Sequence, residues 1–165
     1  MEPVILIRAA FVNDIVAIQQ IAYTTWPVAY GAILSSKQLE YMLAKSYSKE
    51  SLTEQINTGH SFLLAIEKGI PVGFASFNLS APQKYKLQKL YVLPTIHKNG
   101  AGKLLLEAVI ERVKKTGAIT LQLNVNRNNK AIGFYQKMGF EIIEQVDIPI
   151  GNGYFMNDYV MEKAL

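Results

Sequence analysis

Residues 90–103 read LYVLPTIHKNGAGK and are the most informative stretch of the sequence. An apolar run typical of a β-strand stops at Pro94, a short loop follows, and Gly100-Ala101-Gly102 opens a strongly amphipathic segment. A strand, a turn and a helix in this order bring unpaired backbone N–H groups to the positive end of a helix dipole. Glycine lets a phosphate approach the backbone closely, and Lys98 and Lys103 add positive charge. The stretch therefore predicts an anion site, with a tight turn that only packs a helix against a strand as the alternative.

Two well-known phosphate motifs do not fit this stretch. The P-loop needs a hydroxyl residue after Gly102-Lys103, where this chain has Leu104. The dinucleotide-binding motif needs a third glycine, and position 105 is a leucine. Both nucleotide-binding classes are therefore excluded.

Outward from this stretch, the spacing of apolar residues predicts strands and helices in a mixed order. Strands are expected over residues 4–8, 61–67, 71–79, 84–92, 119–125, 141–150 and 154–162. Helices are expected from Asn13-Asp14 to a break at Pro27, after Ser35-Ser36, and over residues 48–57, 101–116 and 129–138. We expect an α/β (α+β) fold with a mixed, mostly antiparallel sheet of six to seven strands flanked by helices.

Composition points to one folded domain, which we expect to span residues 1–165. Half of the residues are hydrophobic and 18% are charged, so the chain can bury a core and intrinsic disorder is excluded. The net charge of +4 suits a polyanionic small ligand as well as a nucleic acid. Charge alone therefore does not identify the partner.

Residue types that carry metal or thiol chemistry are scarce. The chain has no cysteine and two histidines, so disulfides, zinc fingers and a thiol nucleophile are excluded and no metal site is expected. Its first residues lack the pattern of a signal peptide, and no apolar run approaches the roughly 18–20 residues that cross a bilayer. We therefore expect a cytoplasmic protein with no membrane partner.

A second informative stretch, residues 128–140, reads NNKAIGFYQKMGF. Each part has an ordinary structural interpretation: Asn128 as a helix N-cap, Phe134 and Tyr135 as core aromatics, and Gly139 as the residue after a helix. Taken alone, this stretch predicts only a short amphipathic helix.

Together the two stretches resemble the GNAT superfamily of acyl-CoA N-acyltransferases. The family's Arg/Gln-x-x-Gly-x-Gly/Ala signature is matched over residues 97–102, with His97 in place of the usual Arg or Gln. Val92-Leu93-Pro94 matches the end of the family's fourth strand. The downstream motif is matched by Asn128, Ala131, Phe134, Tyr135, Gly139 and Phe140. The resemblance covers residues 61–165 well and the earlier residues only by element order.

The resemblance implies acetyl-CoA as the donor, direct attack by an amine on the thioester, and fourth and fifth strands that splay apart. It implies that backbone groups of Leu90, Tyr91 and Val92 bind the pantetheine and acetyl carbonyl, with an amide near Val92 stabilising the oxyanion. Asn128 would bind the pantetheine arm, and Tyr135 would protonate the departing thiolate. The pyrophosphate would be cradled by Lys98, Asn99, Gly100, Ala101, Gly102 and Lys103.

The acceptor is less defined by the sequence. The candidates for contacting it are Trp26, Tyr30, Gln88, Tyr154 and Asp158, with Asp158 as an anchor for a cation. Residues 84–91 contain no carboxylate to act as base, so water relayed by Gln88 or Tyr91 is expected to take the proton. The arrangement of residues 24–30, 48–57 and 151–165 is similar to bacterial spermine/spermidine-type acetyltransferases, although lysines at 84, 86 and 89 argue against an acidic pocket.

The leading hypothesis is an acetyl-CoA-dependent N-acetyltransferase that acts on a small amine, a polyamine being one candidate. Two alternatives stay open: a protein or peptide N-acetyltransferase, and a catalytically impaired CoA-binding module that serves as a sensor or subunit. Nucleic acid is not expected as a partner, because no basic helix or basic–aromatic face is present. A homodimer is one candidate assembly.

Overall fold

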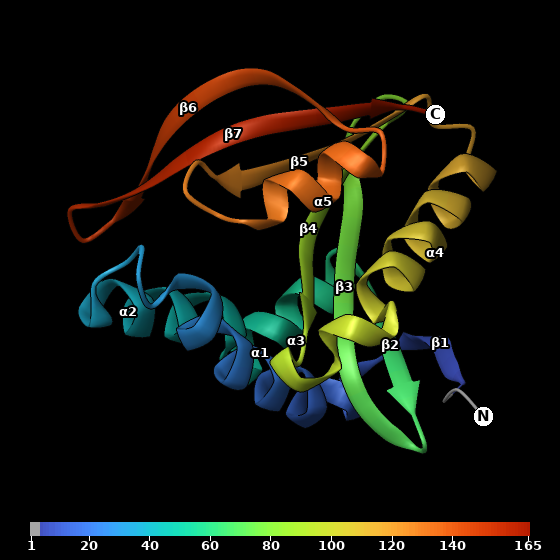
Figure 1. Ribbon diagram of the computed structural model, residues 1–165, viewed down its shortest axis with the longest axis horizontal. Coiled ribbons are helices and arrows are strands. Elements are labelled where there is room, and N and C mark those ends of the chain that lie inside the picture. The colour runs from blue at the N-terminus through green and yellow to red at the C-terminus, as the bar shows by residue number, and fades with distance from the viewer. Residues whose placement is uncertain (1–3) are drawn as a thin grey trace.

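Within residues 4–165, which the structure describes, seven strands form one sheet in the order β1-β2-β3-β4-β5-β7-β6 (Figure 1). This computed structural model describes the side chains as well, except those of residues 97–99. Neighbouring strands are antiparallel, apart from the parallel pair β4–β5. The strands are β1 (Ile5–Ala10), β2 (Ser61–Glu67), β3 (Ile70–Ala81), β4 (Lys84–Val92), β5 (Thr120–Asn126), β6 (Glu141–Gly151) and β7 (Tyr154–Ala164). The predicted fold class is confirmed.

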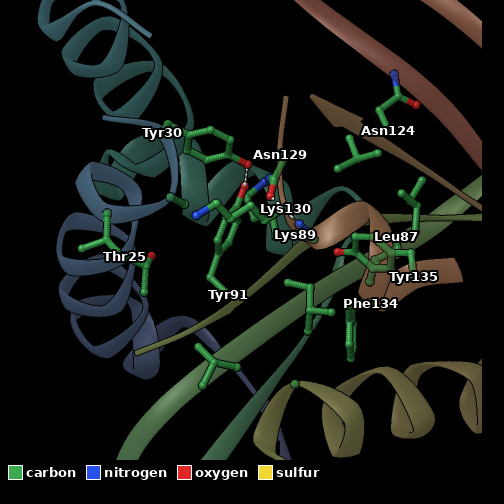
Figure 2. A pocket seen from close by; sticks show the side chains of 18 of the residues that line it. Thr25, Tyr30, Leu87, Lys89, Tyr91, Asn124, Asn129, Lys130, Phe134 and Tyr135 are labelled. Carbon is green, nitrogen blue, oxygen red and sulfur yellow. Dashed lines mark hydrogen bonds between the residues drawn. The ribbon is translucent and has the colours of Figure 1, made fainter. Parts of the chain in front are cut away.

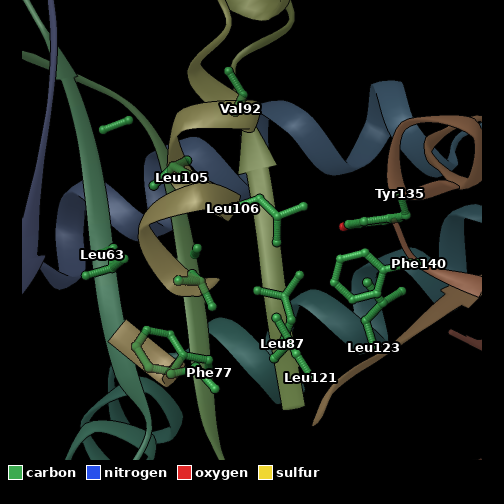
Figure 3. Close-up of a cluster of buried hydrophobic side chains, with 14 of the residues drawn as sticks. Leu63, Phe77, Leu87, Val92, Leu105, Leu106, Leu121, Leu123, Tyr135 and Phe140 are labelled. Atoms are coloured by element: carbon green, nitrogen blue, oxygen red, sulfur yellow. The ribbon is translucent and has the colours of Figure 1, made fainter. Parts of the chain in front are cut away.

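Helices cover both faces of the sheet (Figure 1). On one face α1, α2 and α3 enclose a core that includes Ile18, Leu52 and Phe74. On the other face α4 buries Leu105 against the sheet, in the same cluster as Leu63 (Figure 3). The helices are η1 (Val12–Asp14), α1 (Ile15–Tyr30), α2 (Ser36–Tyr47), α3 (Lys49–Asn57), η2 (Pro94–Asn99), α4 (Ala101–Lys115) and α5 (Ala131–Lys137). In the described part of the chain, no helix is long and apolar enough to span a membrane.

Strands β4 and β5 pair over only four residues each and then diverge. Lys84–Leu87 pairs with Thr120–Leu123, and the pairing stops there. At this point β4 carries a bulge, because Ser76 of β3 lies opposite Lys89 while Phe77 lies opposite Leu87. The predicted splaying of the fourth and fifth strands is confirmed, and it opens the middle of the sheet.

The helix break predicted at Pro27 is wrong, since α1 continues to Tyr30. Proline has no N–H and leaves one carbonyl of the preceding turn without a partner. That turn includes Tyr23, which is half exposed, so water can satisfy the carbonyl. The helix closes with a 2.9 Å bond from the Gly31 N–H to the Pro27 carbonyl, and its last turn buries Trp26 and Tyr30. Burial of these two aromatic side chains outweighs one missing backbone bond.

Helix caps follow the sequence in part. Ser35 and Ser48 accept hydrogen bonds from the N–H groups of Gln38 and Ser51, both at 3.1 Å, so these two helix starts are confirmed. Helix α5 instead begins at Ala131, whose N–H donates to Asn129 Oδ1 at 2.8 Å. The predicted start at residue 129 and the N-cap role of Asn128 are therefore wrong. The preceding asparagine side chains form turns of their own, which compete with helix.

Candidate active site

A cavity of about 720 Å³ lies where β4 and β5 diverge. Its walls come from the end of α1, from residues 87–92 of β4 and residues 123–125 of β5, from the N-terminus of α4, and from residues 128–135. These segments are far apart in the sequence and meet only because the sheet opens at this point (Figure 1). The cavity is therefore the candidate active site.

One end of the cavity is formed by the start of α4. Gly100 has a φ of +77°, a left-handed conformation that favours glycine, and a Cβ there would meet nothing within 4 Å. Gly102 and Lys103 also line the cavity, while Ala101 is buried behind them. The first N–H groups of an α-helix have no intrahelical partner, so this end can hold an anion. The predicted side-chain contacts of Lys98 and Asn99 lie outside the described residues and stay predictions.

Tyr135 of α5 lines the cavity. Its ring packs against Phe134 and Phe140, with centroids 5.3 and 5.9 Å away. Its hydroxyl points toward β4 (Figure 3) and has no hydrogen-bond partner among the described residues. Burial raises the pKa of Tyr135, so the phenol keeps its proton across the physiological range. The group is positioned to donate a proton into the cavity.

A pair of tyrosine hydroxyls faces the other side of β4. The hydroxyls of Tyr30 and Tyr91 are 2.9 Å apart, and the side chain of Asn129 lies beside them (Figure 2). Burial raises the pKa of both tyrosines, so both stay neutral. The sequence predicted Tyr30 as an acceptor contact, and Tyr91 as a backbone contact of the donor and, with Gln88, as a candidate relay to water; the relay stays a prediction. Pairing of the two tyrosine hydroxyls was not predictable, because it depends on the end of α1 packing against β4.

The five predicted acceptor contacts lie in three places. Tyr30 and Gln88 line the cavity, although Gln88 is exposed and donates to Asn78 Oδ1 at 2.9 Å. Trp26 lies behind the lining, with its ring 5.6 Å from that of Tyr91. Tyr154 packs against Tyr41 at the far end of the β6–β7 hairpin.

Asp158 on β7 lies behind the lining as well. It is 2% exposed, and its Oδ1 has no hydrogen-bond partner within the described residues. Burial raises the pKa of this carboxyl, while Asn124, Lys86 and Arg127 act in the opposite direction. A buried carboxylate with a spare oxygen can bind a cation.

Lys89 was not among the predicted site residues. It lines the cavity, and its Nζ donates to Gln55 Oε1 of α3 at 2.8 Å. Asn128, predicted to contact the donor, also lines the cavity and is exposed. Among the side chains that the structure describes, which leave out residues 97–99, no three of His, Asp or Glu are grouped so as to hold a metal ion.

Comparisons with known proteins cover the whole of this arrangement. A sequence profile described as "Acetyltransferase (GNAT) domain" matches residues 32–161. The spermidine N(1)-acetyltransferase of Thermoplasma acidophilum is 30% identical over 95% of this chain and 95% of that protein. The crystal structure of the PaiA N-acetyltransferase from the same organism, in complex with coenzyme A, is similar with a TM-score of 0.86 and 29% identity. That similarity covers 98% of this chain and 99% of the other.

A third relative matches a smaller part. The ribosomal protein bS18-alanine N-acetyltransferase of Haemophilus influenzae is 34% identical over 53% of this chain and 61% of that protein. The two Thermoplasma matches therefore span nearly the whole chain, whereas this one spans about half of it.

Proposed function

Because the chain belongs to the GNAT family of N-acetyltransferases, we propose that it transfers the acetyl group of acetyl-CoA to a primary amine of a small molecule, with a polyamine as the first candidate. The observation that carries this proposal is the cavity between the diverging β4 and β5, which is lined by Tyr135 and by the start of α4. These features match the two ends of a thioester donor: a group that can protonate sulfur and a site for phosphate.

The chain's residues fit the donor. Beyond Leu87 the edge of β4 is no longer paired with β5, so its backbone can bond to the amide groups of a pantetheine arm. Leu90, Tyr91, Val92 and Asn128 all line this part of the cavity. The start of α4, with Gly100, Gly102 and Lys103, supports binding of the pyrophosphate.

In the reaction proposed here, the amine nitrogen forms a bond to the acetyl carbonyl carbon and the carbon–sulfur bond breaks. An amide near Val92 stabilises the oxyanion, as a preorganised donor does in acyl transfer. Tyr135 gives its proton to the departing thiolate and recovers one from the attacking nitrogen. Because burial raises the pKa of Tyr135, the phenol carries its proton at the start of each turnover.

Two observations support a polycationic acceptor. The relative that matches 95% of this chain at 30% identity is named a spermidine N(1)-acetyltransferase. In addition, Asp158 offers a buried carboxylate close enough to Tyr30 of the cavity wall to act on its pKa. Two lysines of β4 are not free to repel a cation in the cavity. Lys86 interacts with the carboxyl of Asp158, and the Lys89 amine donates a hydrogen bond to Gln55 of α3.

The test is release of free thiol from acetyl-CoA with a panel of amines: spermidine, spermine, a simple alkylamine and a peptide that begins with alanine. We expect the polyamines to show kcat/KM at least about tenfold above the alkylamine, because one charge pair in a partly buried site contributes about 1.4 kcal/mol or more. Asp158→Asn should remove most of that advantage, whereas Glu162→Gln, on the same strand, should keep it.

Each alternative has its own outcome in this panel. If the alanine peptide is the best acceptor, the chain is a peptide N-acetyltransferase, as the partial match to the bS18-alanine enzyme would suggest. If acetyl-CoA binds but no amine releases thiol, the chain is a CoA-binding module without catalysis. Either result would contradict the proposed function.

A further inference from the structure

Strand β4, which lines the cavity, contains lysines but no carboxylate. Strand β4 reads KYKLQKLYV over residues 84–92. At neutral pH a primary alkylamine is an ammonium ion, which must lose a proton before its nitrogen can attack a thioester. Tyr30, Tyr91 and Tyr135 cannot take that proton as phenolates, because burial raises the pKa of each. Another group must therefore accept it.

Lys89 is held in an unusual position for a lysine. Its Nζ donates to Gln55 Oε1 at 2.8 Å and lies 5.5 Å from the ring centroid of Tyr47 and 5.9 Å from that of Phe62. No described carboxylate oxygen lies within 4 Å of this nitrogen. The amine is therefore surrounded by rings and one amide rather than by a counter-ion.

The groups that face Lys89 come from each element packed around it. They are Tyr47 of α2, Gln55 of α3, His60 before β2, Phe62 of β2 and Ser76 of β3. None of them is a carboxylate, and His60 would repel the ammonium if it were charged. Burial lowers the pKa of Lys89 to about 8, so part of the population carries a neutral amine near neutral pH.

The bulge in β4 determines which way Lys89 faces. Without it, Lys89 would alternate with Gln88 and share the α4 face with Leu87. With it, Lys89 and Tyr91 both face the α1–α3 side, about 7 Å apart along the strand. Tyr91 in turn is hydrogen-bonded to Tyr30, whose hydroxyl lies at the cavity (Figure 2). The bulge thus places Lys89 on the same side of β4 as Tyr91, two residues before the tyrosine whose hydroxyl meets that of Tyr30.

We propose that Lys89 is the group that accepts the proton of the bound acceptor ammonium, with the hydroxyls of Tyr91 and Tyr30 as the relay. The ammonium gives one proton to the relay, and the relay gives one to the neutral Lys89 amine. The free amine then forms its bond to the acetyl carbon, and the carbon–sulfur bond breaks. Tyr135 protonates the thiolate and regains the second proton of the nitrogen. Lys89 returns its proton to solvent, so each turnover releases one proton.

This role rests on the proposed function, and its test compares two kinds of acceptor. One is an alkylamine, which is protonated near neutral pH. The other is a weakly basic amine that is already neutral there. The variants are Lys89→Met and Lys89→Arg, with Lys84→Met at the other end of β4 as the control. Values of kcat are measured from about pH 6 to about pH 10, because kcat reports on groups in the enzyme–substrate complex.

We expect the wild-type kcat for the alkylamine to rise through a midpoint near 8. Lys89→Met should lower kcat for the alkylamine about 100-fold near neutral pH, and this kcat should recover toward high pH. With the weakly basic amine, kcat of the same variant should change less than about threefold. Lys89→Arg should behave like Lys89→Met, because arginine keeps its proton. Lys84→Met should retain the wild-type profile. The affinity for acetyl-CoA, measured by calorimetry, should be unchanged in all three variants. An unchanged affinity shows that the variants are folded.

The failure of this role is distinct from the failure of the proposed function. Suppose that the wild type acetylates amines. If Lys89→Met then keeps the wild-type pH profile, or if its kcat falls equally for both amines, the proton-acceptor role is wrong and the proposed function stands. A Lys89 side-chain titration midpoint above about 10, measured by lysine NMR, would also overturn the role. If the wild type releases no thiol with any amine, both proposals are wrong.

Discussion

The start of α4 offers a test in which two glycines of the same conformation are compared. Gly100, at the cavity, and Gly69, in the β2–β3 turn, both have a φ of +77°, and a Cβ at either would meet nothing within 4 Å. Replacement by alanine therefore adds no clash and costs only the left-handed backbone conformation, about 1–2 kcal/mol. At Gly69 that cost falls entirely on stability.

At Gly100 the same cost falls partly on binding. A free chain with Gly100→Ala can relax toward a right-handed conformation, which turns the first N–H groups of α4 away from the cavity. Donor binding must then restore the strained conformation. A cost of 1–2 kcal/mol corresponds to an acetyl-CoA Kd that is about 5- to 30-fold weaker.

The assay is calorimetric titration of acetyl-CoA into both variants, with urea unfolding of each. Gly69→Ala should lose about 1–2 kcal/mol of unfolding free energy and keep the wild-type Kd. Gly100→Ala should show the weaker Kd. Equal Kd values for the two variants and the wild type would refute the assignment of the α4 start to the phosphates of the donor.

Two further predictions concern the buried tyrosines. Tyr135→Phe keeps both ring contacts and loses no protein hydrogen bond, so we expect the unfolding free energy to change by less than about 1 kcal/mol. Its kcat should fall about 100- to 1,000-fold at unchanged acetyl-CoA Kd, and an unchanged kcat in the thiol-release assay would rule out the acid role. In addition, Tyr30, Tyr47, Tyr91 and Tyr135 have pKa values raised by burial, so the unfolded chain releases their protons first as pH rises. The contribution of these tyrosines to the free energy of unfolding should be constant below about pH 10. Above that pH it should fall by about 1.4 kcal/mol per pH unit for each tyrosine. Urea unfolding at rising pH measures this, and a free energy that stays flat up to about pH 11 would contradict it.

Much of the fold was predictable because its signals are local. The strand–turn–helix stretch around Pro94 and Gly100 depends on residues within a few positions of one another. The serine caps at Ser35 and Ser48 do so as well. Such features have the same physical cause in a short segment as in the folded chain, so reading them needs no knowledge of distant contacts.

Pro27 shows where local signals mislead. A proline inside a helix costs one backbone hydrogen bond, and the sequence alone therefore predicts a helix end. Helix α1 continues because Trp26 and Tyr30 are buried against α2 and β3–β4, which lie far away in the sequence. The missing hydrogen bond can be predicted from the neighbouring residues, whereas the burial that compensates for it depends on tertiary contacts.

The residues alone were enough to predict the family resemblance, the order of the elements, the turn that precedes α4 and the position of Tyr135 on a short helix. That the end of α1 packs against β4, so that the Tyr30 hydroxyl meets that of Tyr91, depends on tertiary contacts. The tertiary structure also decided, through a bulge at Gln88, that Lys89 faces α3 instead of α4. A bulge of one residue reverses the face of every side chain that follows, and it depends on pairing with a neighbouring strand. The charge of the lysine is visible in the sequence, but the burial that lowers its pKa exists only once the helices and the sheet have packed around it.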